Sequence, residues 1–247
     1  MAEASKSPTQ PVHRTRIKIC GLTREADVDA AVQAGADAIG FVLYAKSPRA
    51  VSYERACELA LRLPAFVTPV LLYVNENTPN LIAARGVNTP GNGRFLLQFH
   101  GDESPEQCAA AGQPYMRAAR IPLGGEASFD LVKFSEDYRA AQAVLVDAHV
   151  EGYGGGGKTF DWTAIPWSHP TINASSRIVL SGGLSPANVA VAIEHVRPWA
   201  VDVSSGVELD AAPNDPIGGT QKGLKSPEKI NQFIAAVRLA DERISKS

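Results

Sequence analysis

The feature that most constrains this chain is an unbroken alternation of strand-like and helix-like segments along the sequence. Eight apolar runs are typical of buried strands, and they cover residues 16–20, 37–43, 68–74, 94–99, 114–121, 141–147, 177–181 and 200–205. Segments with helical spacing follow them at residues 24–34, 53–63, 78–86, 104–112, 128–140, 185–196 and 226–240. Strands that alternate with helices pair in parallel, because each helix returns the chain to the same end of the sheet.

The eight units favour a closed barrel over an open sheet. The strand-like runs are apolar at nearly every residue, which is typical of strands covered on both faces. A closed (β/α)8 barrel takes about 250 residues, and this chain has 247. A doubly wound open sheet usually carries a glycine-rich phosphate turn after its first strand, but residues 20–25 read CGLTRE here. The sequence therefore predicts an α/β fold, a single (β/α)8 TIM barrel with a parallel eight-stranded core.

The predicted barrel takes up residues 16–240 of the chain. Residues 1–15 form a loose or disordered N-terminal tail in this prediction, and residues 241–247 form a short C-terminal tail. The N-terminal residues are polar and lack the apolar segment of a secretory signal. A cytoplasmic location is therefore expected.

Three stretches rich in Gly, Pro, Asn and Asp are expected to be loops added to the barrel. Residues 86–93 and 165–176 precede strands, so they are expected at the floor of the barrel. Residues 209–224 follow the eighth strand, so they are expected at the catalytic rim as a candidate flap. Residues 161–175 contain two prolines, so any helix there is short or broken.

The charge balance excludes two classes of partner. The 24 basic and 26 acidic side chains give a formal net charge of −2. Because the chain has no basic cluster, it offers no electrostatic footprint for nucleic acid or for a membrane surface. No apolar run approaches the roughly 20 residues of a membrane-spanning helix. The sequence leaves the oligomeric state open.

The three cysteines form neither a disulfide framework nor a zinc-binding pattern, because they are odd in number and far apart. Cys57 and Cys108 fall within helical segments and are expected in the core. Cys20 differs from them because it ends the first strand. His100 has no second His or Cys at ligand spacing, so no metal site is predicted.

Two glycine-containing loops follow the seventh and eighth strands, SGGLSPANV at 181–189 and SSGVE at 204–208. Backbone N–H groups of these two loops commonly bind a phosphate in barrel enzymes. The residues whose small side chains let a ligand approach the backbone are Gly182, Gly183, Ser205 and Gly206. Glycines that only form tight turns are the alternative for either loop alone. Two such loops in adjacent units favour a phosphorylated small-molecule ligand.

A thiol and a carboxyl group end the first and sixth strands, at the rim where barrel enzymes place their catalytic residues. Cys20 is a candidate base, and Asp147 is a candidate acid if its surroundings favour the protonated form. The alternatives are a small buried hydrophobic residue for Cys20, and a helix cap or a salt bridge for Asp147. Neither protonation state follows from the sequence.

Two further residues are candidates for substrate binding. Arg49 follows the second strand, and a guanidinium matches a carboxylate with two parallel hydrogen bonds. A surface ion pair with Glu54 or another carboxylate is the alternative for Arg49. His100 follows the fourth strand and has three interpretations: an acid–base group, a hydrogen-bond donor to substrate, or a strand-end residue bonded to Asp102 or Glu103.

Taken together, these motifs resemble the phosphoribosylanthranilate isomerase family, the barrel enzymes of tryptophan biosynthesis. The resemblance runs in family order from residue 16 to about residue 238. It rests on KICGLT (18–23), AGADAIGFV (34–42), SPRAVS (47–52), LQFHGDE (97–103), LVDA (145–148), GKTFDW (157–162), SGGLSPANV (181–189) and VDVSSGVE (201–208).

The resemblance implies an Amadori rearrangement, an internal redox reaction that needs no metal or cofactor. The phosphosugar substrate would be N-(5'-phosphoribosyl)anthranilate, and the product would be 1-(2-carboxyphenylamino)-1-deoxyribulose 5-phosphate. By the same resemblance, Asp147 is the general acid that protonates the ring oxygen, and Cys20, as a thiolate, is the general base that removes the C2 proton. Arg49 would bind the anthranilate carboxylate, and the two glycine loops would bind the phosphate. Asp202 is a candidate for the sugar hydroxyls, although it fits a core position equally well.

Three departures from the family pattern and two alternative functions accompany this interpretation. LLYVN (71–75) replaces a more usual G-V-F-V-N. Gly156 stands where the family usually has Thr in its glycine loop, and Ser226 stands where it usually has Asp before the last helix. Aminoimidazole-carboxamide ribotide isomerase performs the same rearrangement with an Asp in the place of Cys20, so Cys20 argues against that alternative. The other alternative is a non-catalytic phosphosugar-binding barrel that has kept its phosphate loops.

Overall fold

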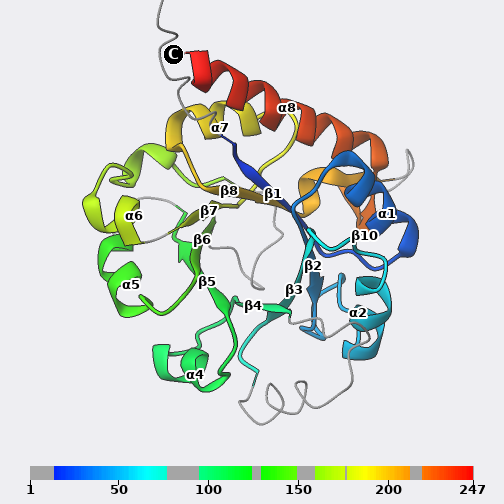
Figure 1. Ribbon diagram of the computed structural model, residues 1–247, viewed down its shortest axis with the longest axis horizontal. Helices are drawn as coiled ribbons and strands as arrows, with labels where there is room; N and C mark the ends of the chain where they lie inside the picture. The colour runs from blue at the N-terminus through cyan, green and yellow to red at the C-terminus, as the bar shows by residue number, and fades with distance from the viewer. Residues whose placement is uncertain are drawn as a thin grey trace, which may run out of the picture.

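The eight strands form a closed parallel barrel (Figure 1). The structure is a computed structural model, and it describes residues 14–76, 95–123, 129–148, 159–175, 177–211 and 219–246. The barrel strands are β1 (Arg16–Cys20), β2 (Ala38–Val42), β3 (Thr68–Tyr73), β4 (Leu96–Phe99), β5 (Tyr115–Ile121), β6 (Ala143–Ala148), β7 (Ile178–Leu180) and β8 (Ala200–Val203). Each strand pairs in parallel with the next, and β8 pairs with β1, which closes the ring. The predicted TIM barrel is therefore confirmed.

Helices surround the barrel (Figure 1). They are α1 (Glu25–Ala34), α2 (Tyr53–Ala60), α4 (Pro105–Ala110), α5 (Leu131–Asp137), α6 (Pro170–Ser175), α7 (Val189–Val196) and α8 (Pro227–Lys246), and a 3-10 turn, η1 (Trp162–Ala164), precedes α6. The separation of η1 from α6 agrees with the short or broken helix predicted at 161–175. The helix predicted at 78–86 and the loop predicted at 86–93 lie outside the described residues.

Local sequence signals start two of these helices at the rim. Ser52 precedes α2, and its hydroxyl accepts a hydrogen bond from the Arg55 N–H at 3.1 Å. Ser104 precedes α4 and forms a capping box with Gln107, and Pro105 takes the first helical position, where no N–H is needed. These caps set the point at which the chain turns from the rim into each helix.

Apolar side chains fill both sides of the barrel wall. The larger cluster lies between the strands and the helices and includes Ile19, Phe41 and Phe99. A smaller cluster lies in the barrel interior and consists of Val70, Met116, Ala118, Ala143, Leu145, Val179 and Ala200. Because successive strand residues alternate between the two sides and both sides are buried, the strands read as continuous apolar runs in the sequence.

The predicted C-terminal tail at 241–247 is wrong up to residue 246, because α8 continues to Lys246. Asp241 on this helix is buried, and its carboxylate accepts hydrogen bonds from the backbone N–H of Thr15 at 3.0 Å and from the Thr15 hydroxyl at 2.6 Å. Thr15 was expected in the N-terminal tail but is fully buried. The other residues of that predicted tail up to 13 lie outside the described residues.

The stretch predicted as a rim loop at 209–224 is partly β-structure. Strands β9 (Glu208–Asp210) and β10 (Thr220–Lys225) pair antiparallel in a separate two-stranded sheet. The Glu208 carboxylate explains the pairing, since it accepts hydrogen bonds from the Thr220 hydroxyl at 3.0 Å and from the Gly223 N–H at 2.8 Å. Residues 212–218 lie outside the described residues.

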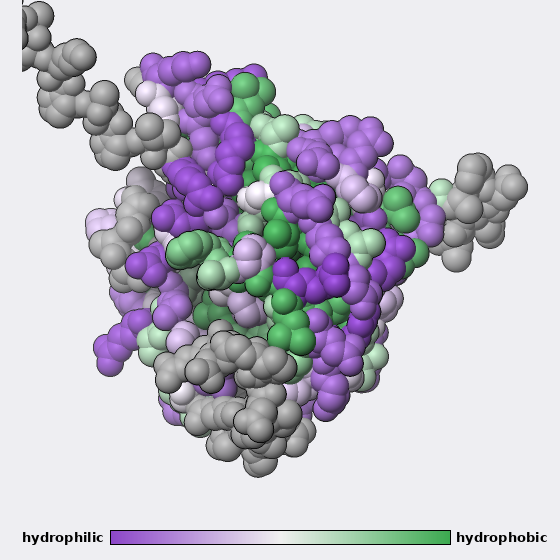
Figure 2. All heavy atoms as spheres, turned by 45° about the vertical axis from the view of Figure 1, so that its right-hand side comes forward, coloured by the Kyte–Doolittle hydropathy of each residue, from purple (hydrophilic) through white to green (hydrophobic). Residues whose placement is uncertain are grey.

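Hydrophilic side chains cover most of the face drawn in Figure 2, with smaller hydrophobic areas between them. In the part of the chain that the structure describes, no helix is both long enough and apolar enough to cross a membrane. The cytoplasmic location stays a prediction.

Candidate active site

Five of the predicted site side chains are buried at the strand ends and in the loops that follow them. Cys20 is the last residue of β1, Asp147 lies near the end of β6, and Asp202 lies in β8. His100 directly follows β4, and Arg49 lies between β2 and α2. Each of the five is less than a tenth exposed. Because all strands of a parallel barrel end at the same mouth, the fold brings these residues to one end of the molecule.

Cys20 and Asp147 both point into the barrel. Ile19 packs in the outer cluster, so the alternation of strand side chains turns Lys18 and Cys20 towards the interior. Val146 packs in the outer cluster as well, so Asp147 also points inwards. β6 lies three positions from β1 around the closed sheet. The thiol and the carboxyl group therefore enter the mouth from different sides.

The thiol of Cys20 lies against a position that has no side chain. Gly40 of β2 pairs in register with Cys20, and a Cβ on Gly40 would lie only 2.7 Å from the Cys20 Sγ. Glycine at this position thus makes room for the sulfur. Burial raises the pKa of the Cys20 thiol, the Lys18 ammonium acts against this effect, and Asp202 adds to it. Two buried charges therefore set the environment of the candidate base.

Lys18 and Asp202 form a buried ion pair across the β1–β8 boundary. The Lys18 Nζ lies 2.8 Å from the Asp202 Oδ1, and both side chains are less than a tenth exposed. Burial opposes the charge on Lys18, but Asp202 and Cys20 outweigh it and raise the pKa of Lys18. Asp202 also lies 3.4 Å from the Ser181 hydroxyl. Asp202, a candidate for the sugar hydroxyls, is therefore engaged by two neighbours within the protein.

Asp147 is the end of a buried chain of three polar side chains. The His100 Nε2 lies 3.1 Å from the Asp147 Oδ2, and the Gln98 Nε2 lies 3.0 Å from the His100 Nδ1. With Gln98 as the donor, His100 carries its proton on Nε2 and donates it to Asp147. His100 thus bonds to Asp147 rather than to Asp102 or Glu103, the partners of its third interpretation.

The two glycine loops that are candidates for phosphate binding pack against each other. Gly182 and Gly183 have φ angles of 84° and 64°, a region that glycine enters without strain. Ser205 and Gly206 lie in a 3-10 turn after β8. A Cβ on Gly206 would lie 2.0 Å from the Leu184 carbonyl oxygen, so only glycine allows this close approach. The four candidate residues therefore lie close together beside the mouth.

The guanidinium of Arg49 is held in a buried ion pair. Its Nε and Nη2 donate to the two carboxylate oxygens of Glu208 at 2.6 and 2.9 Å. The Lys225 Nζ contacts the same carboxylate at 3.2 Å. The carboxylate partner of Arg49 is thus Glu208 inside the protein and not Glu54 on the surface. Glu208 fixes the orientation in which the guanidinium can meet a ligand.

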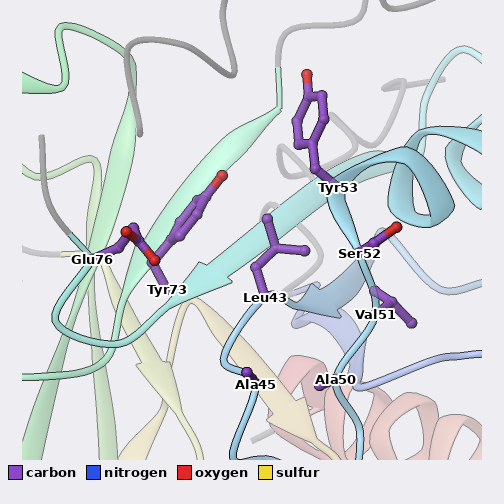
Figure 3. Close-up of a pocket in the computed structure, with 8 residues that line it drawn as sticks. All are labelled: Leu43, Ala45, Ala50, Val51, Ser52, Tyr53, Tyr73 and Glu76. Atoms are coloured by element: carbon purple, nitrogen blue, oxygen red, sulfur yellow. The ribbon is translucent and has the colours of Figure 1, made fainter. Parts of the chain in front are cut away.

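A pocket of about 540 Å³ lies next to the rim but outside the barrel wall (Figure 3). Its lining comes from the ends of β2 and β3 and the start of α2, namely Leu43, Ala45, Ala50, Val51, Ser52, Tyr53, Tyr73 and Glu76. Tyr73 packs with the outer cluster, so its side chain points away from the barrel interior. None of the predicted site residues lines this pocket, so we locate the candidate site at the mouth.

Sequence reasoning missed four residues of this region: Lys18, Gln98, Glu208 and Lys225. Lys18 stands two residues before Cys20 on one strand and shares its face, and Gln98 has the same relation to His100. The alternation of side chains along a strand could therefore have predicted that Lys18 lies beside Cys20 and that Gln98 lies beside His100. Glu208 belongs to the SSGVE motif at the predicted rim, but nothing in the sequence linked it to Lys225, because the pairing of β9 with β10 brings the two together.

The structure describes one of the two departures that lie in the loops and at the last helix, Ser226, but not the other, Gly156. The glycine loop around Gly156 lies outside the described residues. The Ser226 hydroxyl accepts a hydrogen bond from the Lys229 N–H at 3.3 Å at the start of α8. Serine and aspartate are both good N-caps, so the change at Ser226 keeps the helix start.

The other two cysteines were expected in the core. Cys108 is fully buried there, and Cys57 is partly buried and packs against the core.

Sequence comparisons identify relatives over nearly the whole chain. The model of the family described as N-(5'phosphoribosyl)anthranilate (PRA) isomerase matches residues 17–236. The chain is 55% identical over 234 residues to the N-(5'-phosphoribosyl)anthranilate isomerase of Methylibium petroleiphilum. The matched region covers 95% of this chain and 99% of that protein. It is also 55% identical over 230 residues to the protein of the same name from Leptothrix cholodnii, and this matched region covers 93% of this chain and 94% of that protein.

Solved structures match the fold in the same way. Phosphoribosyl anthranilate isomerase from Thermotoga maritima superposes with a TM-score of 0.72 at 35% identity, over 91% of this chain and 98% of that chain. A phosphoribosyl anthranilate isomerase in complex with reduced 1-(o-carboxyphenylamino)-1-deoxyribulose 5-phosphate superposes with a TM-score of 0.69 at 33% identity, with the same coverage.

Proposed function

Because this chain belongs to the N-(5'-phosphoribosyl)anthranilate isomerase family, it is an isomerase of tryptophan biosynthesis, and we propose that Cys20 and Asp147 are the base and the acid of its reaction. The observation that carries this proposal is the placement of both side chains. They point into the same barrel mouth from different sides, beside the two glycine loops.

The reaction is an internal redox change of the sugar. Asp147 gives a proton to the furanose ring oxygen, the bond from that oxygen to C1 breaks, and the nitrogen lone pair forms a C=N⁺ bond. Cys20 as a thiolate then takes the proton from C2, and the electron pair of that C–H bond neutralises the iminium to give an enolamine. The enolamine becomes the ketone when the C2 hydroxyl loses its proton and C1 gains one. C2 is oxidised and C1 is reduced, so no outside electron carrier takes part.

The other site residues orient the substrate. The backbone around Gly182, Gly183, Ser205 and Gly206 binds the phosphate, and Arg49 in its fixed orientation binds the anthranilate carboxylate. His100 donates to Asp147 and positions its carboxyl group at the ring oxygen. Asp202 acts near the sugar but is already paired with Lys18.

Turnover of N-(5'-phosphoribosyl)anthranilate, followed by the loss of its fluorescence, tests this assignment. We expect the wild-type protein to convert the substrate, and Cys20→Ser and Asp147→Asn each to lower kcat by several orders of magnitude while the circular dichroism spectrum stays unchanged. Near-normal turnover in either variant would refute the role of that residue. A wild-type protein that binds the reduced product analogue but turns over no substrate would indicate a binding protein instead.

A further inference from the structure

The candidate base is a buried thiol, and burial works against the form that can act as a base. The thiolate, not the thiol, is the reactive species of cysteine. Cys20 is only 4% exposed, and burial raises the pKa of its thiol. A positive charge close to the sulfur is therefore needed if the thiolate is to form at neutral pH.

Lys18 places such a charge beside the sulfur. It lies two residues before Cys20 on β1, so both side chains point into the barrel from the same strand face. A Cβ on Gly40 would lie 2.7 Å from the Cys20 Sγ and 3.1 Å from the Lys18 Nζ. The sulfur and the ammonium nitrogen therefore both lie next to the space that the missing side chain of Gly40 leaves open. The charge of Lys18 lowers the pKa of the Cys20 thiol, against the effect of burial.

Asp202 holds Lys18 in this position and keeps it charged. The carboxylate lies 2.8 Å from the Lys18 Nζ, and neither group is more than 7% exposed. Burial alone would lower the pKa of Lys18, but Asp202 and Cys20 together raise it above its ordinary value. The ammonium form of Lys18 is therefore the form present at neutral pH.

We propose that Lys18 is a positioning residue for the isomerisation: its ammonium, held by Asp202, stabilises the thiolate of Cys20 and directs it into the mouth. This inference rests on the proposed role of Cys20 as the base. The Cys20 thiol releases its proton to solvent before the substrate binds, and the thiolate becomes a thiol again when it takes the C2 proton. Lys18 keeps its own protons throughout.

A second buried lysine near the mouth does not take this role. The charged groups that act on Cys20 are Lys18 on β1, Asp202 on β8 and Lys225 on β10, and the neighbouring strand β2 carries no charged residue. The Lys225 Nζ is bound to the Ser204 carbonyl oxygen at 2.9 Å and to Glu208. Lys225 is thus committed to other partners, and its influence on the thiol is smaller than that of Lys18.

The direct test measures the thiolate rather than turnover. Cys20 is alkylated with iodoacetamide over a range of pH in the wild-type protein and in Lys18→Met, and peptide mass spectrometry reports the rate at Cys20 alone. We expect the midpoint of the rate–pH curve to rise by about one unit in Lys18→Met, which lowers the thiolate fraction at neutral pH about ten-fold. Lys225→Met is the matched control, and we expect a smaller shift.

Kinetics of the same variants separate positioning from simple structural damage. We expect Lys18→Met to lower kcat with little change in KM, and its activity to recover as pH rises, because the thiolate returns at higher pH. Lys18→Arg keeps the charge and should retain part of the activity at neutral pH. Lys18→Met leaves the buried Asp202 carboxylate without an opposite charge, which lowers stability. The double variant Lys18→Met/Asp202→Asn removes both charges and so avoids this cost. It should also show an upward shift of the alkylation midpoint, but a smaller one than Lys18→Met, because the Asp202 carboxylate that raises the pKa of Cys20 is removed as well.

Two outcomes separate this inference from the proposed function. If Cys20→Ser is inactive but the alkylation midpoint is the same in the wild-type protein, Lys18→Met and the double variant, Cys20 keeps its role and the inference about Lys18 is wrong. If Cys20→Ser turns over substrate normally, the proposed function fails, whatever the alkylation midpoints are.

Discussion

At the scale of single residues, the mouth depends on neighbours that orient the reactive groups. Gln98 is fully buried, and its Nε2 lies 3.0 Å from the His100 Nδ1. Because this contact makes the His100 Nδ1 an acceptor, the ring proton lies on Nε2, the nitrogen that faces Asp147. The Gln98 Oε1 has no hydrogen-bond partner within the described part of the chain. Gln98 therefore orders the acid at some expense to stability, because a buried unpaired oxygen is unfavourable.

Replacement of Gln98 by a side chain of similar size separates these two effects. In Gln98→Met we expect kcat to fall about ten-fold, because His100 loses the contact that orients it towards Asp147. We expect the melting temperature to change little, because removal of the unpaired Oε1 offsets the loss of the hydrogen bond to the buried His100 Nδ1. Steady-state kinetics and thermal unfolding measure the two quantities, and an unchanged kcat would show that Gln98 does not orient His100.

At the scale of elements, α8 connects the two ends of the chain. Asp241 on α8 accepts hydrogen bonds from the backbone N–H and the hydroxyl of Thr15, directly before β1. Arg238, one turn earlier, donates to the Thr15 carbonyl oxygen at 2.7 Å. The last helix therefore fixes the start of the first strand, and residues predicted as a tail stabilise the barrel.

Removal of the Asp241 carboxylate tests this connection. We expect Asp241→Ala to lower the free energy of unfolding by about 2 kcal/mol, because buried donors of Thr15 lose a charged acceptor. The exposed neighbour supplies the control: Glu242→Ala should change the free energy by less than about 0.5 kcal/mol. Urea denaturation measures both, and equal effects of the two substitutions would contradict the proposed connection.

At the scale of the whole molecule, a buried charge cluster joins the barrel rim to the β9–β10 sheet. Glu208 is fully buried and accepts hydrogen bonds from Arg49, Lys225 and the Gly223 N–H. Burial alone would raise the pKa of Glu208, but these partners outweigh it and lower the pKa to about 2. The cluster is formed only when the chain is folded, so its protonation is coupled to global stability.

Acid should therefore weaken the fold through Glu208. Because the folded-state pKa is depressed, the stabilisation is fully present above the ordinary value near 4.5 and is lost as pH falls towards about 2. The full contribution is roughly 3 kcal/mol, of which about 2 kcal/mol is lost by pH 3. Urea denaturation of the wild-type protein and of Glu208→Gln at pH 6 and pH 3 measures it. We expect the difference between the two proteins to shrink at pH 3, and a difference independent of pH would contradict this role of Glu208.

The sequence by itself determined the strands, most of the helices and the closed barrel, because apolar runs and their periodicity are properties of neighbouring residues. It also placed Cys20 and Asp147 at strand ends, where the parallel topology requires them to share a mouth. Tertiary structure alone decided the partners: Lys18 with Asp202, Arg49 with Glu208, and Thr15 with Asp241. These pairs join residues more than 150 positions apart in the chain. Their contacts depend on ring closure and strand register, which no local pattern encodes.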